Sequence, residues 1–178
     1  MGDPGVTEAK GSGQVPIPEE DKSEGKQDPN QEGAFVFSSE EDAVKAFGDK
    51  YAPLSKTERQ EYGAVIEKNA DGKYAYSNVM NSTMTAAKNG KTIDPASADK
   101  DPLRNTIGYK YTSNSVATVH THWRSDGNLN FSNPSDYKST RPVDHMYLIN
   151  REGDIYSSQR SSAEGNINGF SPGTKLSK

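Results

Sequence analysis

Alternating apolar and polar positions predict a β-hairpin over residues 60–77. The side chains of residues 60–67 alternate as they do in a strand with one buried face, and three apolar ones share that face: Tyr62, Ala64 and Ile66. Residues 69–72, with the sequence Asn-Ala-Asp-Gly, are typical of a tight turn. Residues 73–77 then form the expected return strand. Residues 78–87 are expected to continue the sheet weakly.

A helix is predicted before this hairpin, because apolar residues there recur with helical spacing. Ser38 stands three residues before Glu41, which is the spacing of a capping box. The helix is expected to end near Phe47, with Gly48 just beyond it and Pro53 closing the region.

A second set of strands is predicted in the C-terminal half of the chain. Residues 115–122 alternate in character, so His120 and His122 share one face of the expected strand. The opposite face holds Ala117, Val119 and Thr121. Residues 88–112, which precede this strand, are rich in Lys, Asp, Asn, Gly and Pro and are expected to form a long loop with short ordered pieces.

After the histidine strand we expect a polar loop over residues 123–135. A short helix is then expected from about Ser135 to Thr140, because Pro142 disfavours helical conformation in the residue before it. The remaining elements follow in this order: strand 146–150, turn 151–154 and return strand 155–157. This mixture of helices and strands predicts an α+β domain.

Composition divides the 178-residue chain into a polar N-terminal segment and a folded part. Residues 1–33 contain no aromatic residue and have a net charge of −5, whereas the charge of the whole chain is −4. Such a segment buries too little apolar surface to offset the entropy of ordering it, so we expect a disordered acidic tail or linker. Residues 34–160 are expected to form the domain, and residues 161–178, rich in Ser and Gly, a flexible C-terminal tail.

Charge and composition narrow the possible classes of function. A pI near 5.4 disfavours a nucleic-acid binder that relies on phosphate contacts, so nucleic acid is not an expected partner. No stretch approaches the roughly 18 apolar residues that span a bilayer, and the N-terminus lacks the apolar core of a signal peptide. The chain has no cysteine, which excludes disulfides and thiolate metal sites.

The candidate chemistry centres on two of the three histidines. The imidazoles of His120 and His122 would lie about 6–7 Å apart along one strand face, a good separation for binding one ion. Zinc suits imidazole and carboxylate ligands with one position left for water. Asp136 is the candidate third ligand, and Asp126 in the same loop is the alternative. Without a metal the pair would be two surface or hydrogen-bonded histidines. His145 is expected at a strand edge, or in contact with a ligand, rather than as a ligand itself.

In chain order these residues resemble the motif of the JAMM (JAB or MPN+) metallopeptidases. Two histidines, a serine and an aspartate occur in the order of that family: His120, His122, Ser132 and Asp136. The family places a glutamate on an earlier strand, followed by a glycine and aliphatic residues, and residues 61–66 are similar to that element. Residues 146–156 resemble the closing hairpin of JAB-like domains at the C-termini of Rhs and other polymorphic toxins.

The resemblance implies a JAB-like, cytidine-deaminase-like fold, in which a mixed β-sheet is flanked by helices. It implies that His120, His122 and Asp136 ligate zinc and that a water fills the fourth position. Glu61 would take a proton from that water and pass it to the leaving amine. Ser132 would hydrogen-bond the developing oxyanion. The implied reaction is hydrolysis of a peptide or isopeptide bond.

The sequence departs from the family motif at two points. Trp123 stands where the family usually has proline, and three residues rather than two separate Ser132 from Asp136. Ser135 is an alternative for the oxyanion role, although its expected role is the N-cap of the following helix. Glu67 is an alternative for the catalytic acid. Trp123 is expected either to line a substrate groove or to cover the edge of the sheet.

The toxin resemblance also implies a biological setting. It describes a secreted effector, delivered without a cleavable signal peptide, that acts on a protein substrate in the cytoplasm of a target cell. A cognate immunity protein would neutralise it in the producing cell. Two other functions stay open: a nonenzymatic JAB-like binding module, favoured by the two departures, and a metal-dependent nuclease toxin, because His and Asp sites also serve phosphoryl chemistry.

Overall fold

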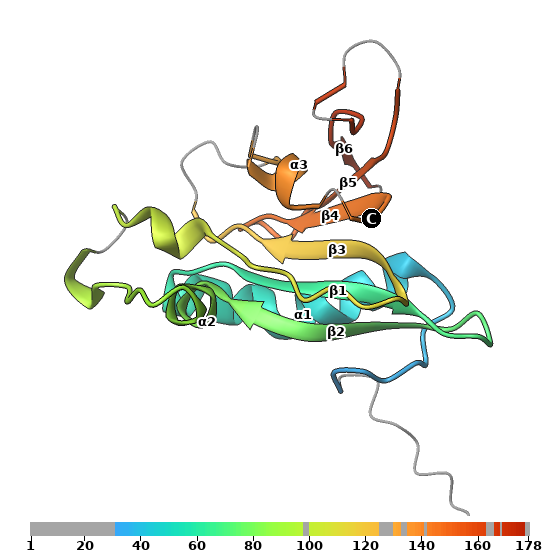
Figure 1. The fold of residues 1–178 in the computed structure, drawn as a ribbon, viewed down its shortest axis with the longest axis horizontal. Helices are drawn as coiled ribbons and strands as arrows, with labels where there is room; N and C mark the ends of the chain where they lie inside the picture. Colours follow the sequence, from blue (N-terminus) through green and yellow to red (C-terminus); the bar gives the residue numbers. More distant parts are fainter. Residues whose placement is uncertain are drawn as a thin grey trace, which may run out of the picture.

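The protein folds around a six-stranded mixed sheet with the strand order β2-β1-β3-β4-β5-β6 (Figure 1). The computed structural model describes residues 31–97, 100–124, 130–132, 135–140, 142–162, 166–167 and 169–176. The strands are β1 (Tyr62–Lys68), β2 (Tyr74–Asn81), β3 (Ser115–Thr121), β4 (His145–Ile149), β5 (Ile155–Gln159) and β6 (Thr174–Lys175). The helices are α1 (Glu40–Glu58), α2 (Ser82–Lys88) and α3 (Ser135–Ser139), with short 3-10 turns η1 (Pro95–Ser97) and η2 (Pro102–Asn105).

The sheet contains one parallel pair. Strands β3 and β4 are parallel, and the chain between them includes α3. The other neighbours, β1 with β2, β1 with β3, β4 with β5 and β5 with β6, are antiparallel. The expected α+β class with a mixed sheet is therefore confirmed.

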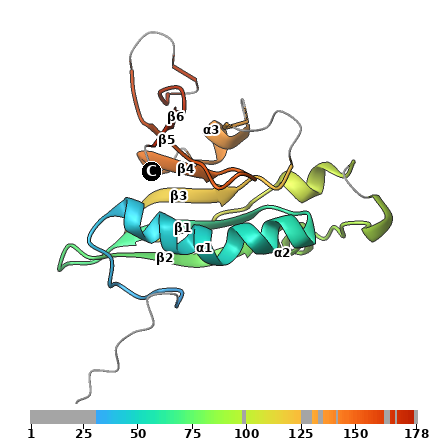
Figure 2. The ribbon, with the colours of Figure 1, turned by 180° about the vertical axis from the view of Figure 1, so that it is seen from behind.

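One face of the sheet is covered by α1, which lies in front of the strands in Figure 2. The apolar residues of α1 pack against the predicted inward faces of β1 and β3, and this larger core is made mainly of Ala43, Val44, Phe47, Tyr51, Tyr62, Ala64, Ile66, Tyr76, Ala117 and Val119. The two-residue periodicity of residues 60–67 and 115–122 thus assigned the faces correctly, because alternate side chains of a strand must point to opposite sides.

Helix α1 is longer than the sequence pattern predicts. Its N-cap is Ser39, whose hydroxyl accepts a hydrogen bond from the backbone N–H of Asp42 at 3.1 Å, so the expected cap at Ser38 is wrong by one residue. Gly48 lies inside the helix rather than beyond it, and a Cβ there would lie 2.5 Å from Ile149 Cδ1. The helix passes Pro53 and continues to residue 58, because burial of side chains beyond Gly48 favours a continuous helix.

Residues 82–88 also differ from expectation, because they form α2 instead of continuing the sheet. The side chain of Asn81 accepts a hydrogen bond from the backbone N–H of Met84 at 2.8 Å, which is the usual N-cap contact that begins a helix. Between residues 88 and 112, the part that the structure describes contains two 3-10 turns and no strand, as expected.

Both ends of the predicted domain extend further than the sequence suggests. The backbone N–H of Gly33 donates to Tyr76 O at 2.9 Å, and Phe170 is 0% exposed. Much of the segment expected to be a flexible C-terminal tail therefore packs on the sheet, and residues 174–175 pair with β5. Residues 1–30 lie outside the described residues, so the acidic tail stays a prediction.

The second core lies on the face of the sheet opposite α1. It consists of Phe131, Tyr137, Met146, Leu148 and Phe170. This cluster joins the segment around α3, strand β4 and the C-terminal segment. Within the described residues, no helix is long and apolar enough to cross a membrane.

Candidate metal centre

Strand β3 presents the two histidines on the face opposite α1. His120 pairs with Gly63 of β1, and the backbone N–H of His122 donates to Ile149 O at 2.9 Å, which continues the parallel ladder beyond Thr121. The side chains are 3% and 2% exposed for His120 and His122. Buried histidines require polar partners, and the strand directs both imidazoles toward the same partners.

Asp136 reaches these imidazoles from the first turn of α3. Its backbone N–H donates to Ser132 O at 3.1 Å, and its Oδ2 accepts a hydrogen bond from the Ser132 backbone N–H at 2.6 Å. These two bonds close a small ring that fixes the carboxylate relative to the preceding loop. The expected third ligand is therefore held at the site although its position lies beyond the usual motif spacing.

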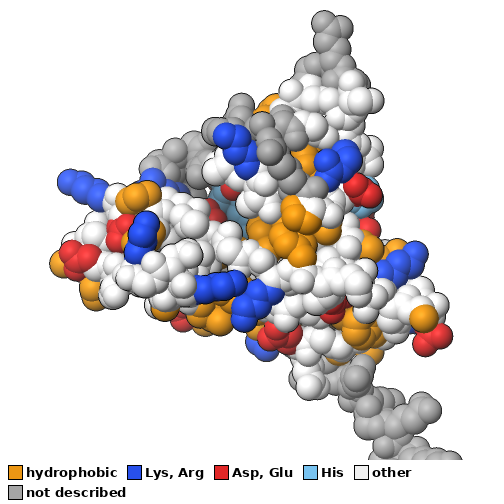
Figure 3. Space-filling view, viewed as in Figure 1, with side chains coloured by type: hydrophobic (Ala, Val, Ile, Leu, Met, Phe, Trp, Pro, Cys, Tyr) orange, Lys and Arg blue, Asp and Glu red, His pale blue; other side chains and the backbone are white. Residues whose placement is uncertain are grey.

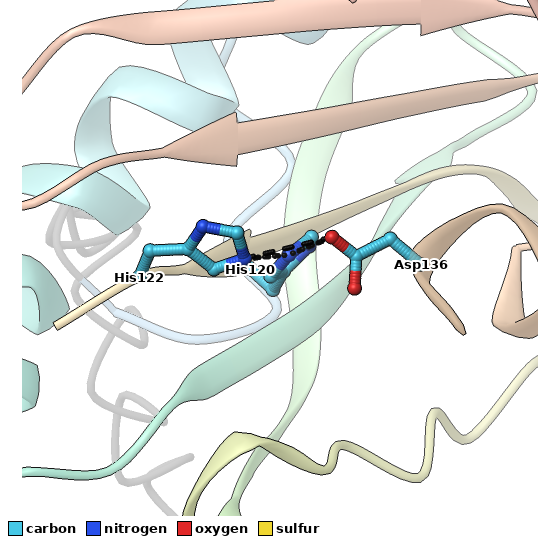
Figure 4. A group of neighbouring side chains, drawn as sticks. All are labelled: His120, His122 and Asp136. Carbon is cyan, nitrogen blue, oxygen red and sulfur yellow. Dashed lines mark hydrogen bonds and ion pairs between the residues drawn. The ribbon is translucent and has the colours of Figure 1, made fainter. Parts of the chain in front are cut away.

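The three side chains meet with atoms close enough to share one ion (Figure 4). The Nε2 atoms of His120 and His122 lie 3.1 Å apart, and Asp136 Oδ2 lies 3.2 Å from the first and 3.5 Å from the second. Ligands bound tetrahedrally at 2.0–2.2 Å are separated by about 3.3–3.6 Å. The observed triangle is within about 0.2 Å of one face of such a tetrahedron, so this group could bind a metal ion.

Glu61 lies beside the triangle, immediately before β1. Its Oε1 is 3.6 Å from His122 Nε2. Its backbone N–H donates to Arg104 O at 2.9 Å and to Ser82 Oγ at 3.2 Å. These contacts hold Glu61, the residue before β1, against α2 and η2, so Glu61 does not depend on the strand alone for its position.

Burial and neighbouring charges shift the pKa values of the two carboxyl groups in opposite directions. Burial raises the pKa of Glu61 from 4.5 to about 8, although the charge of His122 acts to lower it. Burial would also raise the pKa of Asp136, but His120 and His122 hold it well below its usual range. One carboxyl group is thus an anion suited to a ligand, whereas the other retains a proton at neutral pH when no cation is present.

A small pocket of about 100 Å³ opens onto this group. Its walls include Glu61, His120 and Asp136 together with Tyr109 and Asn105. Figure 3 shows histidine atoms in a recess of the surface, with acidic atoms beside them. A small polar group in this pocket can therefore reach Glu61 and two of the candidate ligands, His120 and Asp136.

The two serines proposed for the oxyanion role have different surroundings. Ser132 contacts Asp136 through its backbone, and Ser135 and Ser139 line the pocket. The oxyanion role of Ser132 stays a prediction, and Ser135 is the alternative that borders the pocket. Asp126, the alternative third ligand, lies outside the described residues.

Three further residues named from the sequence lie away from the ligand triangle. Glu67 pairs with Ser115 at the other end of β1, and its carboxylate accepts a hydrogen bond from Thr112 Oγ1. His145 Nδ1 lies 2.8 Å from Glu40 Oε2 at the strand edge, as expected. Trp123 is buried, and its Nε1 donates to Asn105 Oδ1 at 2.9 Å. It therefore supports a residue that lines the pocket and does not itself line a surface groove.

Sequence patterns missed the contribution of the segment 105–109. Tyr109 belongs to the segment 88–112, which was expected to form a long loop, yet it lines the pocket, and burial raises the pKa of its hydroxyl. Gly63 was the available signal, because glycine in a strand often marks the close approach of another segment. A Cβ on Gly63 would lie 2.7 Å from Ile107 Cγ2 and 3.1 Å from Tyr109 Cε1.

The structure thus defines an α+β protein with a buried His-His-Asp group that could hold a metal ion. Comparison with protein families, with curated proteins and with solved structures found no match.

Proposed function

We propose that this protein is a metal-dependent hydrolase of peptide or isopeptide bonds. The observation that supports the proposal is the convergence of four side chains from three separate segments: the buried Glu61, His120 and His122, and the half-buried Asp136. Burying polar groups costs free energy, so a cluster of such groups usually has a functional reason.

Zinc is the proposed ion, because two imidazole nitrogens and one carboxylate oxygen match the ligand set of catalytic zinc sites. His120, His122 and Asp136 would hold it. When bound, such an ion supplies a Lewis acid and a water whose pKa is lowered toward neutrality. The set has three protein ligands, which is typical of catalytic rather than structural zinc sites.

Glu61 is the proposed general base. Its carboxylate lies beside the ligand triangle without belonging to it, which leaves it within reach of a water bound there. A divalent cation a few ångströms away favours the ionised form of Glu61 and so opposes the effect of burial on its pKa. Glu61 would accept a proton on Oε1 and return it to the leaving amine.

The pocket supports acyl transfer at this position. Ser135 and Tyr109 border it and offer hydroxyl groups, and Ser132 is the serine that the JAMM resemblance assigns to the oxyanion. The same resemblance supports a broader proposal, in which the domain is the effector module of a secreted polymorphic toxin with an immunity protein as its partner.

Metal content tests the first half of the proposal. Purified wild-type protein is expected to contain about one zinc per chain, and His120→Ala combined with His122→Ala is expected to abolish it. His145→Ala is the matched control, because it removes the third histidine, which contacts Glu40 instead. Equal metal content in the wild type and the double variant would eliminate the metal site.

Activity tests the second half. Glu61→Gln is expected to retain zinc and to lose about 10²-fold or more of the hydrolysis rate, since it removes proton transfer but no ligand. The substrate is best sought by mass spectrometry of new peptide termini in a proteome incubated with the wild type and with Glu61→Gln. Cleavage of nucleic acid in zinc, magnesium or manganese, with no new peptide termini, would replace this proposal by the nuclease alternative.

A further inference from the structure

A second pocket is lined by different residues from the candidate metal centre. Its lining includes residues of α2, the helix that lies toward the left end of the sheet in Figure 1. It has a volume of about 560 Å³ and lies between the C-terminal end of α1, the exposed side of α2 and the segment 91–95. Its charged lining residues are Glu58, Arg59, Lys91 and Arg104. We propose that this pocket binds an oxyanion, a phosphate or carboxylate group, through Arg104, Arg59 and Lys91.

Arg104 is the central observation, because no carboxylate among the described residues pairs with its buried charge. The residue is 7% exposed, and within the described residues its guanidinium donates to backbone oxygens: Nη1 to Arg59 O at 3.1 Å and Nη2 to Asp94 O at 3.2 Å. Across the described parts of the chain, Arg104 forms no ion pair and its Nε has no hydrogen-bond partner. A buried guanidinium normally pairs with an anion, since an unpaired buried charge is strongly unfavourable.

The charges around Arg104 add to the attraction for an anion. Arg59 and Lys91 line the same pocket and have exposed side chains. The one acidic lining residue, Glu58, already accepts hydrogen bonds on Oε2 from Tyr62 Oη at 2.5 Å and from Gln60 Nε2 at 2.8 Å. The pocket therefore has a net positive charge although the whole chain is negative.

The chemistry of these groups selects an oxyanion. A guanidinium offers donors in a fixed plane that match the oxygens of a carboxylate or phosphate, and a lysine adds a mobile charge. The pocket is also linked to the metal centre, because Arg104 O accepts the backbone N–H of Glu61 and the next residue, Asn105, lines the catalytic pocket. The proposed anion site does not depend on the hydrolase proposal, since none of its lining residues is a candidate metal ligand or base.

Calorimetric titration of the full chain with inorganic phosphate and, separately, with N-acetylaspartate tests the proposal. At low and constant ionic strength, at least one of the two is expected to bind saturably with one site per chain. The ligand that binds more tightly identifies the group as phosphate or carboxylate. The same titration of the His120→Ala, His122→Ala variant must retain binding, which separates this site from any anion bound through a metal.

Variants of the exposed lining residues avoid the folding risk of changing buried Arg104. Lys91→Gln and Arg59→Asn are each expected to raise the Kd about threefold to fivefold, and together about tenfold. Asparagine suits position 59, where φ is 51°. Lys88→Gln on α2 does not line the pocket and should leave the Kd unchanged. Absence of saturable binding, or an equal Kd in the wild type and the Lys91, Arg59 double variant, would overturn the proposal.

Discussion

The raised pKa of Glu61 follows from the position of this residue immediately before β1. The residue precedes the strand, its backbone contacts η2 and α2, and its carboxyl group is buried beside His122. Burial disfavours the charged carboxylate, which raises the pKa of Glu61 from 4.5 to about 8 in the folded protein. The metal-free protein is therefore expected to hold one more proton than the unfolded chain between these two values.

Because of this proton, the stability of the metal-free protein depends on pH in a defined direction. Because the folded pKa of Glu61 lies above its unfolded value of 4.5, its contribution to stability is complete below pH 4.5 and is lost as the pH rises through about 8. Metal-free Glu61→Gln lacks this loss. The free energy of unfolding of the wild type minus that of Glu61→Gln should therefore fall with pH, by at most about 1.4 kcal/mol per unit.

Denaturant unfolding after dialysis against a chelator measures this difference at several pH values. Glu67→Gln is the matched control, since Glu67 lies in β1, the strand that follows Glu61, but contacts Thr112 instead of the histidines. Parallel stability curves for the wild type and Glu61→Gln between pH 5 and 8 would show that Glu61 does not retain the proton.

Strand β1 and the segment 105–109 fit together through the absence of a side chain at Gly63. This glycine pairs with His120, and the side chains of Ile107 and Tyr109 pass directly over it. The register between β1 and β2 also shifts between Gly63 and Val65. A glycine in a strand often marks the close approach of another segment or a local irregularity, and β1 shows both at Gly63, next to the candidate metal centre.

Gly63→Ala is expected to destabilise the protein by about 1–3 kcal/mol, because the new Cβ would overlap Ile107 Cγ2. It should also weaken zinc binding by displacing the wall of the pocket. Ile107→Ala removes the overlapping atom, so the double variant should recover part of the loss that Gly63→Ala causes. Additive losses in a double-mutant cycle of unfolding free energies would contradict this account of the contact.

At the scale of the whole molecule, the C-terminal segment packs against α3, the helix that supplies Asp136. Phe170 packs with Phe131 and Tyr137, and the latter directly follows the candidate ligand. The same cluster includes Met146 and Leu148 of β4. Packing on this face therefore links the third ligand to the sheet that presents the two histidines.

Phe170→Ala is expected to cost about 3–5 kcal/mol of stability, as is usual for a fully buried phenylalanine. Zinc affinity should fall as well, because the segment around Asp136 loses its packing partner. Met84→Ala is the control for apolar truncation, since Met84 is 46% exposed and should change stability little. Unfolding and zinc titration of both variants measure the two effects, and unchanged zinc affinity in a folded Phe170→Ala protein would mean that α3 is held by other contacts.

Much of the local structure was predictable because it depends on neighbours in the sequence. In the turn after β1, the Asn69 side chain accepts hydrogen bonds from the backbone N–H groups of Asp71 and Lys73, and Gly72 has a φ of 75°. The faces of β1 and β3 were predictable for the same reason. The extension of α1 past Gly48 and Pro53 was not, because it depends on contacts with strands that lie far away in the chain.

The sequence by itself determined that His120 and His122 share a face, since the two-residue period of a strand is a local property of the backbone. Only the tertiary structure decided which other groups meet them. Pairing of Gly63 with His120 places Glu61 next to the histidines, and α3 brings Asp136 to within 3.5 Å of both imidazoles. Distances between segments so far apart in the chain arise from the pairing of strands and the packing of the core, which no single stretch of sequence specifies.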